Sequence, residues 1–323
     1  MKNINIGFLG AGDVADLHAE AINQLEGANL MGLWNRTPEK AKTKAKKYGC
    51  KTYATEDELL HDPSIDAVFI LTNMETHCDY TIRAAEAGKH ILVEKPAASS
   101  IAELQQMKSA VAKAGVYCMP VHNYIYEAGI QRTKSMIEKG QLGDITQFYM
   151  LYNIHHAHDI RARYPGVIRQ ILTHHSYTML YLAGLPRTVS CLKHTSDAST
   201  APQENVAMAT LQMGNGSLSH LCASFANDDH AGDPWTCMIK VMGTKGSTRY
   251  SYRDWVINTP NGAHSQTYQC YPESIKNTAT HFVDKVLREG EAPLSSLEDA
   301  ITCQQIIEAC ERSVTEGIHV AFP

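Results

Sequence analysis

The 323-residue sequence has no apolar run approaching the roughly 20 residues that a membrane-spanning helix needs. It also lacks an excess of basic charge, since 29 Lys and Arg stand against 34 Asp and Glu, for a formal net charge of -5. That balance argues against nucleic acid or an anionic membrane as the main partner. Internal repeats, low-complexity linkers and heptad patterns are absent as well. What remains is a globular chain long enough for more than one domain.

The nine cysteines contain no Cys-x-x-Cys pair and are scattered from Cys50 to Cys310. An odd, scattered set is typical of reduced thiols in a cytosolic enzyme rather than of a disulfide framework. The N-terminus does not read as a signal peptide, because the polar turn Gly10-Ala11-Gly12-Asp13 interrupts its apolar stretch early. We therefore expect a cytoplasmic protein.

Strand-like and helix-like segments alternate through the first third of the chain. The pattern predicts strands at 4–9, 30–34, 67–71, 90–93 and 117–121. It predicts helices at 13–25, 38–48, 76–87 and 99–114. This βαβ alternation is typical of α/β proteins and predicts a doubly wound, mostly parallel sheet over residues 1–121.

The rhythm changes after about residue 122. Long strand candidates then follow one another with few helices, at 145–152, 188–193, 206–213, 217–225, 238–242 and 248–257. Helices are expected at 128–138, 171–182, 274–288 and 297–315. Gly214-Asn215-Gly216 and Gly243-Thr244-Lys245-Gly246 have the composition of tight hairpin turns. Residues 122–323 are therefore expected to form an α+β domain with an antiparallel or mixed sheet.

A glycine-rich turn, Gly10-x-Gly12-x-x-Ala15, follows the first strand and opens the first helix. Gly10 allows a tight turn, and Gly12 lets the backbone approach a pyrophosphate whose charge sits against the helix N-terminus. Asp13 and Val14 open that helix. In this context the pattern indicates a binding site for NAD or NADP.

Two further turns belong to the same predicted sheet edge. NAD-binding sheets often carry an acidic residue after the second strand, but here Asn35 and Arg36 stand there, which permits a 2′-phosphate and keeps both NAD and NADP open. Thr72 and Asn73 follow the strand at 67–71, where backbone and hydroxyl groups can contact a cofactor. A helix cap at Thr76 is an equally compatible explanation of that segment.

The run from His90 to Pro96 is the most informative stretch, because a short buried strand ends abruptly in a charged pair and a proline. Reacting groups gather at the carboxyl edge of open α/β sheets, so Lys95 is the first candidate for catalysis. Burial or nearby positive charge would lower its pKa and suit it to bind a reacting hydroxyl or carbonyl. The structural alternative is a strand-end lysine paired with Glu94. Pro96 is a candidate for a cis bond.

The segment 153–164 is polar and poorly periodic, as expected of a loop that forms a substrate wall. Its three histidines invite a metal interpretation, but no cysteine or well-spaced carboxylate set supports them, so no metal site is predicted: His155, His156 and His158. Three arginines are candidates to clamp an anionic substrate group, with exposed charge as the alternative: Arg161, Arg163 and Arg169.

His174 and His175 begin a helical run whose apolar residues pack on one face, so one histidine of the pair should point off that face. Histidine is the usual acid or base near neutral pH. Taken singly, each histidine is better explained as a packed or capping residue.

Taken together, the motifs resemble the Gfo/Idh/MocA oxidoreductases essentially from end to end. Glu94-Lys95-Pro96, preceded by Ala84-Ala85-x-x-Gly88-Lys89-His90, is the most specific feature. The other matching motifs are individually modest: Gly10-x-Gly12-x-x-Ala15, Asn35-Arg36, Thr72 with His77, Asn123, Ile137-x-x-Gly140-x-x-Gly143, Gly243-Thr244-Lys245-Gly246 and Asp299-Ala300 with Ser313-x-x-x-Gly317.

The resemblance implies a Rossmann domain at 1–121, followed at 122–323 by a domain with a large open, mostly antiparallel sheet for substrate binding and oligomerisation. A homodimer or homotetramer is expected. The implied activity is NAD(P)-dependent hydride transfer to or from a sugar, sugar derivative or cyclitol. Lys95 matches the family lysine that contacts the reacting oxygen, and His77, Glu94 and Asn123 join the expected cofactor-binding residues.

The family often has an aspartate four residues before an active-site histidine, on a helix that ends near the position of Gly184. Counting back places His174 on the histidine and Gln170 on the aspartate. Gln170 can orient a sugar hydroxyl but cannot accept a proton as a carboxylate would. That leaves Lys95 and His174 as the expected proton-transfer pair.

A second position also departs from the family pattern. Ile125 stands where an arginine is common, so Tyr124 or Tyr126 is expected to line the sugar site instead.

Two alternative functions stay open. One is an NAD-dependent glycosidase that oxidises ring C3 transiently, eliminates the aglycone, adds water and re-reduces the ring. The other is a dinucleotide-dependent sensor without turnover, against which the retained Lys95 and His174 argue.

Overall fold

The computed structural model describes residues 2–154, 162, 164–196, 202–226, 235–251 and 270–322. The chain forms two compact units. The first comprises Met1–Tyr126 and Pro272–Ile301, and the second comprises Glu127–Tyr271 and Thr302–Pro323. Residues 272–301 thus return to the first unit, whereas the sequence predicted a single boundary between residues 121 and 122.

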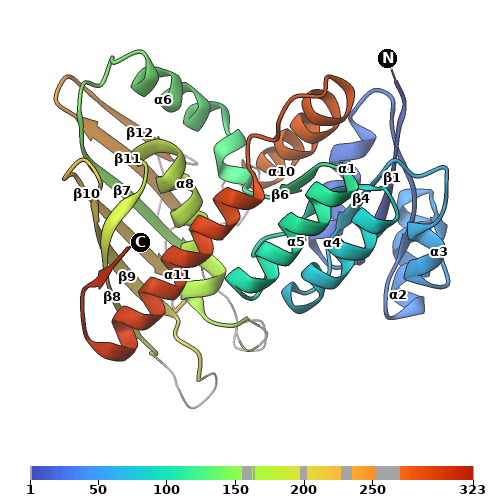
Figure 1. The fold of residues 1–323 in the computed structure, drawn as a ribbon, viewed down its shortest axis with the longest axis horizontal. Helices are drawn as coiled ribbons and strands as arrows, with labels where there is room; N and C mark the ends of the chain where they lie inside the picture. Colours follow the sequence, from blue (N-terminus) through green and yellow to red (C-terminus); the bar gives the residue numbers. More distant parts are fainter. Residues whose placement is uncertain are drawn as a thin grey trace, which may run out of the picture. The chain divides into compact units, whose positions relative to one another are not determined.

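The first unit is built on a six-stranded parallel sheet in the order β3-β2-β1-β4-β5-β6 (Figure 1). The strands are β1 Ile4–Leu9, β2 Ala28–Trp34, β3 Lys51–Thr52, β4 Ala67–Ile70, β5 His90–Val93 and β6 Cys118–Pro120. The order reverses between β1 and β4, which is where open α/β sheets bind ligands beyond the carboxyl ends of their strands. The predicted doubly wound Rossmann sheet is confirmed.

The helices between the strands of this sheet are α1 Val14–Asn23, α2 Pro38–Tyr48, α3 Glu56–Leu60, α4 His77–Glu86 and α5 Ile101–Ala114. Some of their ends have clear local causes. Pro38 occupies the first turn of α2, and Gly49 ends that helix in the left-handed region. The Ser100 hydroxyl accepts the Glu103 N–H, so α5 starts after Ser100 rather than at Ser99.

The second unit contains a seven-stranded sheet in the order β12-β11-β7-β10-β9-β8-β13. Its strands are β7 Ile145–Ile154, β8 Pro186–His194, β9 Val206–Met213, β10 Leu218–Ser224, β11 Trp235–Gly243, β12 Ser247–Ser251 and β13 Val320–Ala321. Only β7 and β10 pair in parallel, so the predicted large, mostly antiparallel sheet is confirmed. Both predicted hairpins are present, since β9 pairs with β10 and β11 with β12.

One face of this sheet is covered by α6 Ala128–Glu138 and α8 Thr173–Ala183 (Figure 1). A π-helical turn, η3 Ile168–Leu172, precedes α8 and occupies the start of the helix predicted at 171–182. Along β9 buried and exposed residues alternate, as expected for a sheet with one packed face. The last helices are α10 Cys270–Thr280, the π-helical η4 His281–Arg288, and α11 Leu297–Glu316. None of the helices in the described ranges is long and apolar enough to cross a membrane.

Candidate functional site

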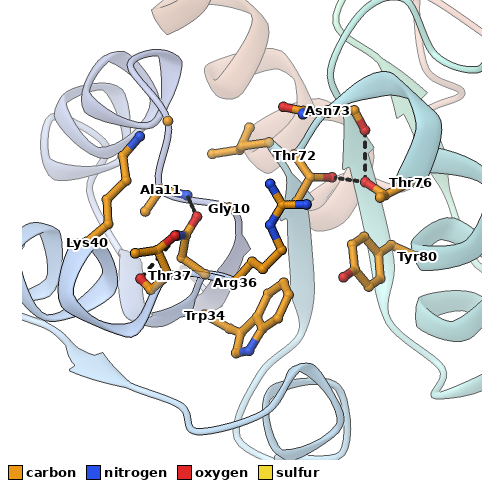
Figure 2. A pocket seen from close by; sticks show the side chains of 13 residues that line it. Gly10, Ala11, Trp34, Arg36, Thr37, Lys40, Thr72, Asn73, Thr76 and Tyr80 are labelled. Carbon is orange, nitrogen blue, oxygen red and sulfur yellow. Dashed lines mark hydrogen bonds between the residues drawn. The ribbon is translucent and has the colours of Figure 1, made fainter.

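A pocket opens in the first unit beyond the carboxyl ends of β1, β2 and β4 (Figure 2). It is lined by Gly10, Ala11, Gly12, Trp34, Asn35, Arg36, Thr37, Lys40, Leu71, Thr72, Asn73, Thr76 and Tyr80. The sequence predicted members of this set from three separate turns, and the fold brings those turns together at the β1–β4 switch point. Asp13 and Val14, which were predicted with them, open α1 without lining the pocket.

Gly10 fixes the shape of the first turn. Its φ of 109° is in the left-handed region, and a Cβ there would lie 2.6 Å from the Leu71 carbonyl oxygen. The backbone N–H of Gly10 donates to the carbonyl of Trp34 at 2.9 Å, which ties the β1 and β2 turns together. A Cβ at Gly12 would make no close contact within the protein. Packing therefore does not require a glycine there, and the predicted role of Gly12 is to let a ligand approach the backbone.

Asn35 braces the turn after β2. Its Oδ1 accepts the Ala11 N–H at 3.1 Å, and its Nδ2 donates to the Thr37 carbonyl at 3.2 Å. The carboxamide therefore holds the glycine turn against the start of α2. In Figure 2 the cationic side chains of Arg36 and Lys40 extend on either side of that turn. The lining residues include these two cations and no carboxylate, which favours an anionic ligand.

The third turn is organised by two hydroxyl groups. Thr76 Oγ1 lies 2.7 Å from Thr72 Oγ1 and 2.8 Å from the Asn73 carbonyl oxygen. Because a hydroxyl donates a single proton, Thr72 donates to Thr76, which donates to Asn73. Thr76 is the N-cap residue of α4, as the helix-cap alternative expected, but its side chain makes no cap hydrogen bond.

His77, the first residue of α4, is buried behind this turn rather than lining the pocket. Its Nε2 lies 3.0 Å from the Thr72 carbonyl oxygen, and its Nδ1 lies 2.9 Å from the Pro96 carbonyl oxygen. His77 thus connects the pocket to the Glu94-Lys95-Pro96 segment.

Glu94 directly follows β5 and carries a buried carboxylate. Its Oε1 lies 2.9 Å from Nε2 of the fully buried His18, and its Oε2 accepts the Lys95 N–H at 3.0 Å. Burial works to raise the pKa of Glu94, but the hydrogen bond and charge of His18, with the charge of Lys95, hold it below its usual value. His18 was missed by sequence analysis, because a lone histidine on the inner face of α1 resembles any packed helix residue.

Lys95 follows Glu94 at the same sheet edge and is half-buried. Burial lowers the pKa of Lys95 to about 8, and the negative charge of Glu94 opposes that shift. The ammonium is therefore close to its titration point in mildly alkaline solution. The Lys95–Pro96 peptide bond is cis, as the sequence predicted.

The residues after β6 lie in the core of the first unit. Asn123 and Tyr126 belong to the short 3-10 helix η2 Asn123–Tyr126, and Asn123 Nδ2 donates to Ser274 Oγ at 2.6 Å. The Tyr126 hydroxyl lies 2.9 Å from Ser295 Oγ, whose proton goes to the Pro120 carbonyl. Tyr124 is fully buried. These contacts give Tyr126 a structural role in the core, and a place for it in a sugar site stays a prediction.

In the second unit both histidines of α8 are buried, at 2% exposure for His174 and 0% for His175. The expectation that one of them points off the packed face is wrong, because α8 is buried on nearly every side. His174 Nδ1 lies 2.6 Å from the Tyr177 hydroxyl. Burial lowers the pKa of His175 to about 3, so this ring is neutral at physiological pH. Gln170 lies in η3, one turn before His174.

Arg169 pairs with the chain's own Glu311. Its Nε and Nη2 donate to the two carboxylate oxygens at 2.5 and 2.9 Å. That bidentate pair occupies one edge of the guanidinium and gives Arg169 a structural role, while a role in clamping an anionic substrate stays a prediction.

Five other predicted residues lie outside the described residues: His155, His156, His158, Arg161 and Arg163. Within the described ranges no group of three or more His, Cys, Asp or Glu side chains is arranged to hold a metal ion. Eight cysteines in those ranges are free thiols.

Comparison with known proteins agrees with this fold. Residues 4–122 match the oxidoreductase family with the NAD-binding Rossmann fold, and residues 130–249 match the GFO/IDH/MocA C-terminal domain. Inositol 2-dehydrogenase of Rhizobium meliloti (strain 1021) is 25% identical over 334 residues, covering 99% of each chain. Glycosyl hydrolase family 109 protein 2 of Phocaeicola vulgatus is 29% identical over 170 residues, 50% of this chain and 40% of that protein.

Among solved structures, levoglucosan dehydrogenase in complex with NADH and levoglucosan has the same fold. The TM-score is 0.87 at 22% identity, with 100% of each chain covered. Since the two family models together match most of the chain, the protein belongs to the Gfo/Idh/MocA family of NAD-dependent oxidoreductases.

Proposed function

We propose that this protein is a dehydrogenase that transfers a hydride between a nicotinamide dinucleotide and a ring carbon of a sugar, sugar derivative or cyclitol. The observation that carries the proposal is that the anion-favouring pocket and Lys95 share one edge of one parallel sheet. The substrate class is supported by relatives named as dehydrogenases of inositol and levoglucosan.

The pocket residues suit a dinucleotide. The Gly10–Gly12 turn keeps side chains away from the N-terminus of α1, where backbone N–H groups and the helix dipole favour a diphosphate. Arg36 and Lys40 add positive charge at the β2 side of the pocket. When bound, the nicotinamide supplies or takes up the hydride.

The same cations support a preference for the 2′-phosphorylated cofactor. Asn35 uses its carboxamide on Ala11 and Thr37, and no lining residue offers a carboxylate to a ribose 2′-hydroxyl. Arg36 and Lys40 are available on that side to pair with a 2′-phosphate. NADP is therefore proposed over NAD, and either dinucleotide is accommodated by the Gly10 turn.

Lys95 and His174 are proposed to handle the proton. The Lys95 ammonium would hydrogen-bond and polarise the substrate oxygen, while His174 accepts or donates its proton. Gln170 can orient a hydroxyl but not act as a base. Lys95 and His174 belong to different units, so their pairing in one active site is itself part of the proposal.

The test is a panel of aldoses, glycosides and cyclitols offered with NAD or NADP, followed by the absorbance of the reduced nicotinamide. Stoichiometric reduction with at least one sugar or cyclitol is expected. Tight dinucleotide binding without turnover on any of them would instead favour a sensor and overturn the proposal.

A glycosidase is the second candidate, because 50% of the chain aligns with a family 109 glycosyl hydrolase at 29% identity. Ring oxidation at C3 acidifies the adjacent C–H, the aglycone is eliminated, water adds, and the ring is re-reduced. Such an enzyme releases the aglycone of a nitrophenyl glycoside with no net change in nicotinamide absorbance. A dehydrogenase shows net reduction and no aglycone release.

The predicted homodimer or homotetramer is proposed to form through the outer face of the second sheet. Leu192 and Met208 are cross-strand neighbours there, with Leu218 on the same face, and they are 77%, 48% and 53% exposed. Exposed apolar side chains gathered on one sheet face are typical of a protein–protein interface. Light scattering of Leu192→Glu would show a smaller assembly if this face is used.

A further inference from the structure

His77 makes two contacts whose chemistry is unusual for a buried histidine. The side chain is 1% exposed, and each ring nitrogen lies within hydrogen-bond distance of a backbone carbonyl oxygen, at 3.0 Å for Thr72 and 2.9 Å for Pro96. Thr72 lines the pocket, and Pro96 directly follows Lys95. One rigid ring therefore lies between the pocket wall and the lysine segment.

A carbonyl oxygen only accepts, and a neutral imidazole has a single N–H, so the neutral ring donates to one of the two carbonyls at a time. Burial lowers the pKa of His77, although both carbonyls and the charges of Glu94 and Glu75 act to raise it. The ring is thus neutral near pH 7, and its single N–H donates either to the Thr72 carbonyl or to the Pro96 carbonyl. Because the separation of the two ring nitrogens is fixed, the ring holds the Thr72 and Pro96 carbonyl groups at a fixed spacing.

Each of the two linked segments also has a hydrogen bond of its own at this edge. Thr72 is held within its own turn by Thr76, and Lys95 is held by the Glu94 carboxylate through its backbone N–H. The β4 and β5 strands pair up to Ile70 and Val93, and the Glu94 N–H reaches the Ile70 carbonyl. Beyond that point His77 contacts both strand-end turns, one through each ring nitrogen.

We propose that His77 is a positioning residue that couples ligand occupancy of the pocket to the placement of Lys95, through the Thr72 carbonyl on one side and the Pro96 carbonyl on the other. The inference rests on the proposed dinucleotide pocket. Ordering of the Thr72 turn by the adenosine half of the ligand fixes the imidazole. The imidazole in turn fixes the turn that carries Lys95.

The test uses ADP, which carries the adenosine and diphosphate groups but no nicotinamide that could contact Lys95 directly. Amide hydrogen exchange of the unmodified protein is measured with and without saturating ADP. We expect slower exchange in segments 10–16 and 71–76 and, through His77, exchange slowed about threefold or more in segment 94–98. Protection of segment 10–16 without any change in 94–98 overturns the role of His77. No protection anywhere overturns the proposed dinucleotide pocket, and His77 with it.

Two variants separate the contacts. In His77→Asn the amide stands near the position of Nδ1 and can still donate to Pro96, whereas in His77→Gln it stands near Nε2 and can still donate to Thr72. Each variant breaks one side of the connection. We expect both to keep ADP protection of segment 10–16 and to lose it in 94–98. Full retention of the 94–98 effect in both variants contradicts the proposal. If neither variant folds, the measurement on the unmodified protein decides.

Discussion

The two units place their candidate functional residues by different means. In the first, the carboxyl ends of β1, β2, β4 and β5 meet at one edge, and four separate turns converge there. In the second, Gln170, His174 and His175 come from one continuous helical stretch, and burial around α8 decides what they can do. A parallel sheet gathers distant motifs by topology. The side chains on a helix face, by contrast, depend for their protonation and hydrogen bonding on the residues that pack against them.

Removing the ammonium of Lys95 should give the largest effect. Lys95→Ala deletes the group proposed to polarise the substrate oxygen, and we expect turnover to fall on the order of 10³-fold, within the range of acid–base contributions. Dinucleotide affinity should stay within about twofold, because the pocket is lined by other turns. Steady-state kinetics and fluorescence titration measure the two quantities.

The exposed Lys113→Ala on α5 is the matched control and should leave both quantities unchanged. Near-normal turnover in Lys95→Ala would contradict the proposed role of Lys95 in polarising the substrate oxygen.

Gly10→Ala should break the pocket itself. The new Cβ meets the Leu71 carbonyl at 2.6 Å in a left-handed backbone, so we expect dinucleotide affinity to fall about 100-fold and stability by roughly 1–3 kcal/mol. Gly49→Ala is the matched control, because its φ of 72° is also left-handed but nothing lies within 4 Å of the added Cβ. It should cost about 1 kcal/mol and leave binding intact. Equal binding by both variants would contradict the close approach at Gly10.

The pH dependence should follow Lys95. With its pKa lowered to about 8, the charged form that polarises oxygen is present below pH 8 and is lost as pH rises through that value. Turnover should therefore fall on the alkaline side of pH 8. Lys95→Arg keeps a positive charge at all accessible pH values and should move that limb upward, at lower overall activity. An alkaline limb unchanged in Lys95→Arg would assign it to another group.

The smallest effect concerns cofactor choice. Arg36→Ala combined with Lys40→Ala should weaken NADPH binding about tenfold, or about 1.4 kcal/mol, and change NADH binding little. The control is Lys42→Ala, which removes an exposed α2 lysine paired with Glu39. Equal losses of affinity for NADPH and NADH would mean that the two cations bind the diphosphate rather than a 2′-phosphate.

The sequence predicted most of the first unit because its signals are local. Gly10 needs a positive φ, and Thr72 directly follows a buried strand, so each could be placed without knowing its neighbours. The β3 and β13 strands were missed because two residues show no periodicity. His18 and His77 gained their roles from partners distant in sequence, Glu94 and Pro96, which no local pattern reports.

The second unit was harder to predict for the same reason. The apolar spacing near His174 predicted a helix with one packed face, but η3 changes the local turn and α8 is buried on nearly all sides. Arg169 looked available for an anion, yet Glu311 on α11 lies 142 positions along the chain and pairs with it. Long-range partners of this kind decide whether a polar side chain is structural or functional.

The central prediction is that a dinucleotide binds along the edge shared by the glycine turn and Lys95. A crystal structure of the protein with NADP or NAD bound tests it most directly. We predict the diphosphate against Gly10 and Gly12, the adenosine between Arg36 and Thr72, and the nicotinamide next to Lys95. A dinucleotide bound elsewhere, or one whose nicotinamide lies away from Lys95, would contradict the account.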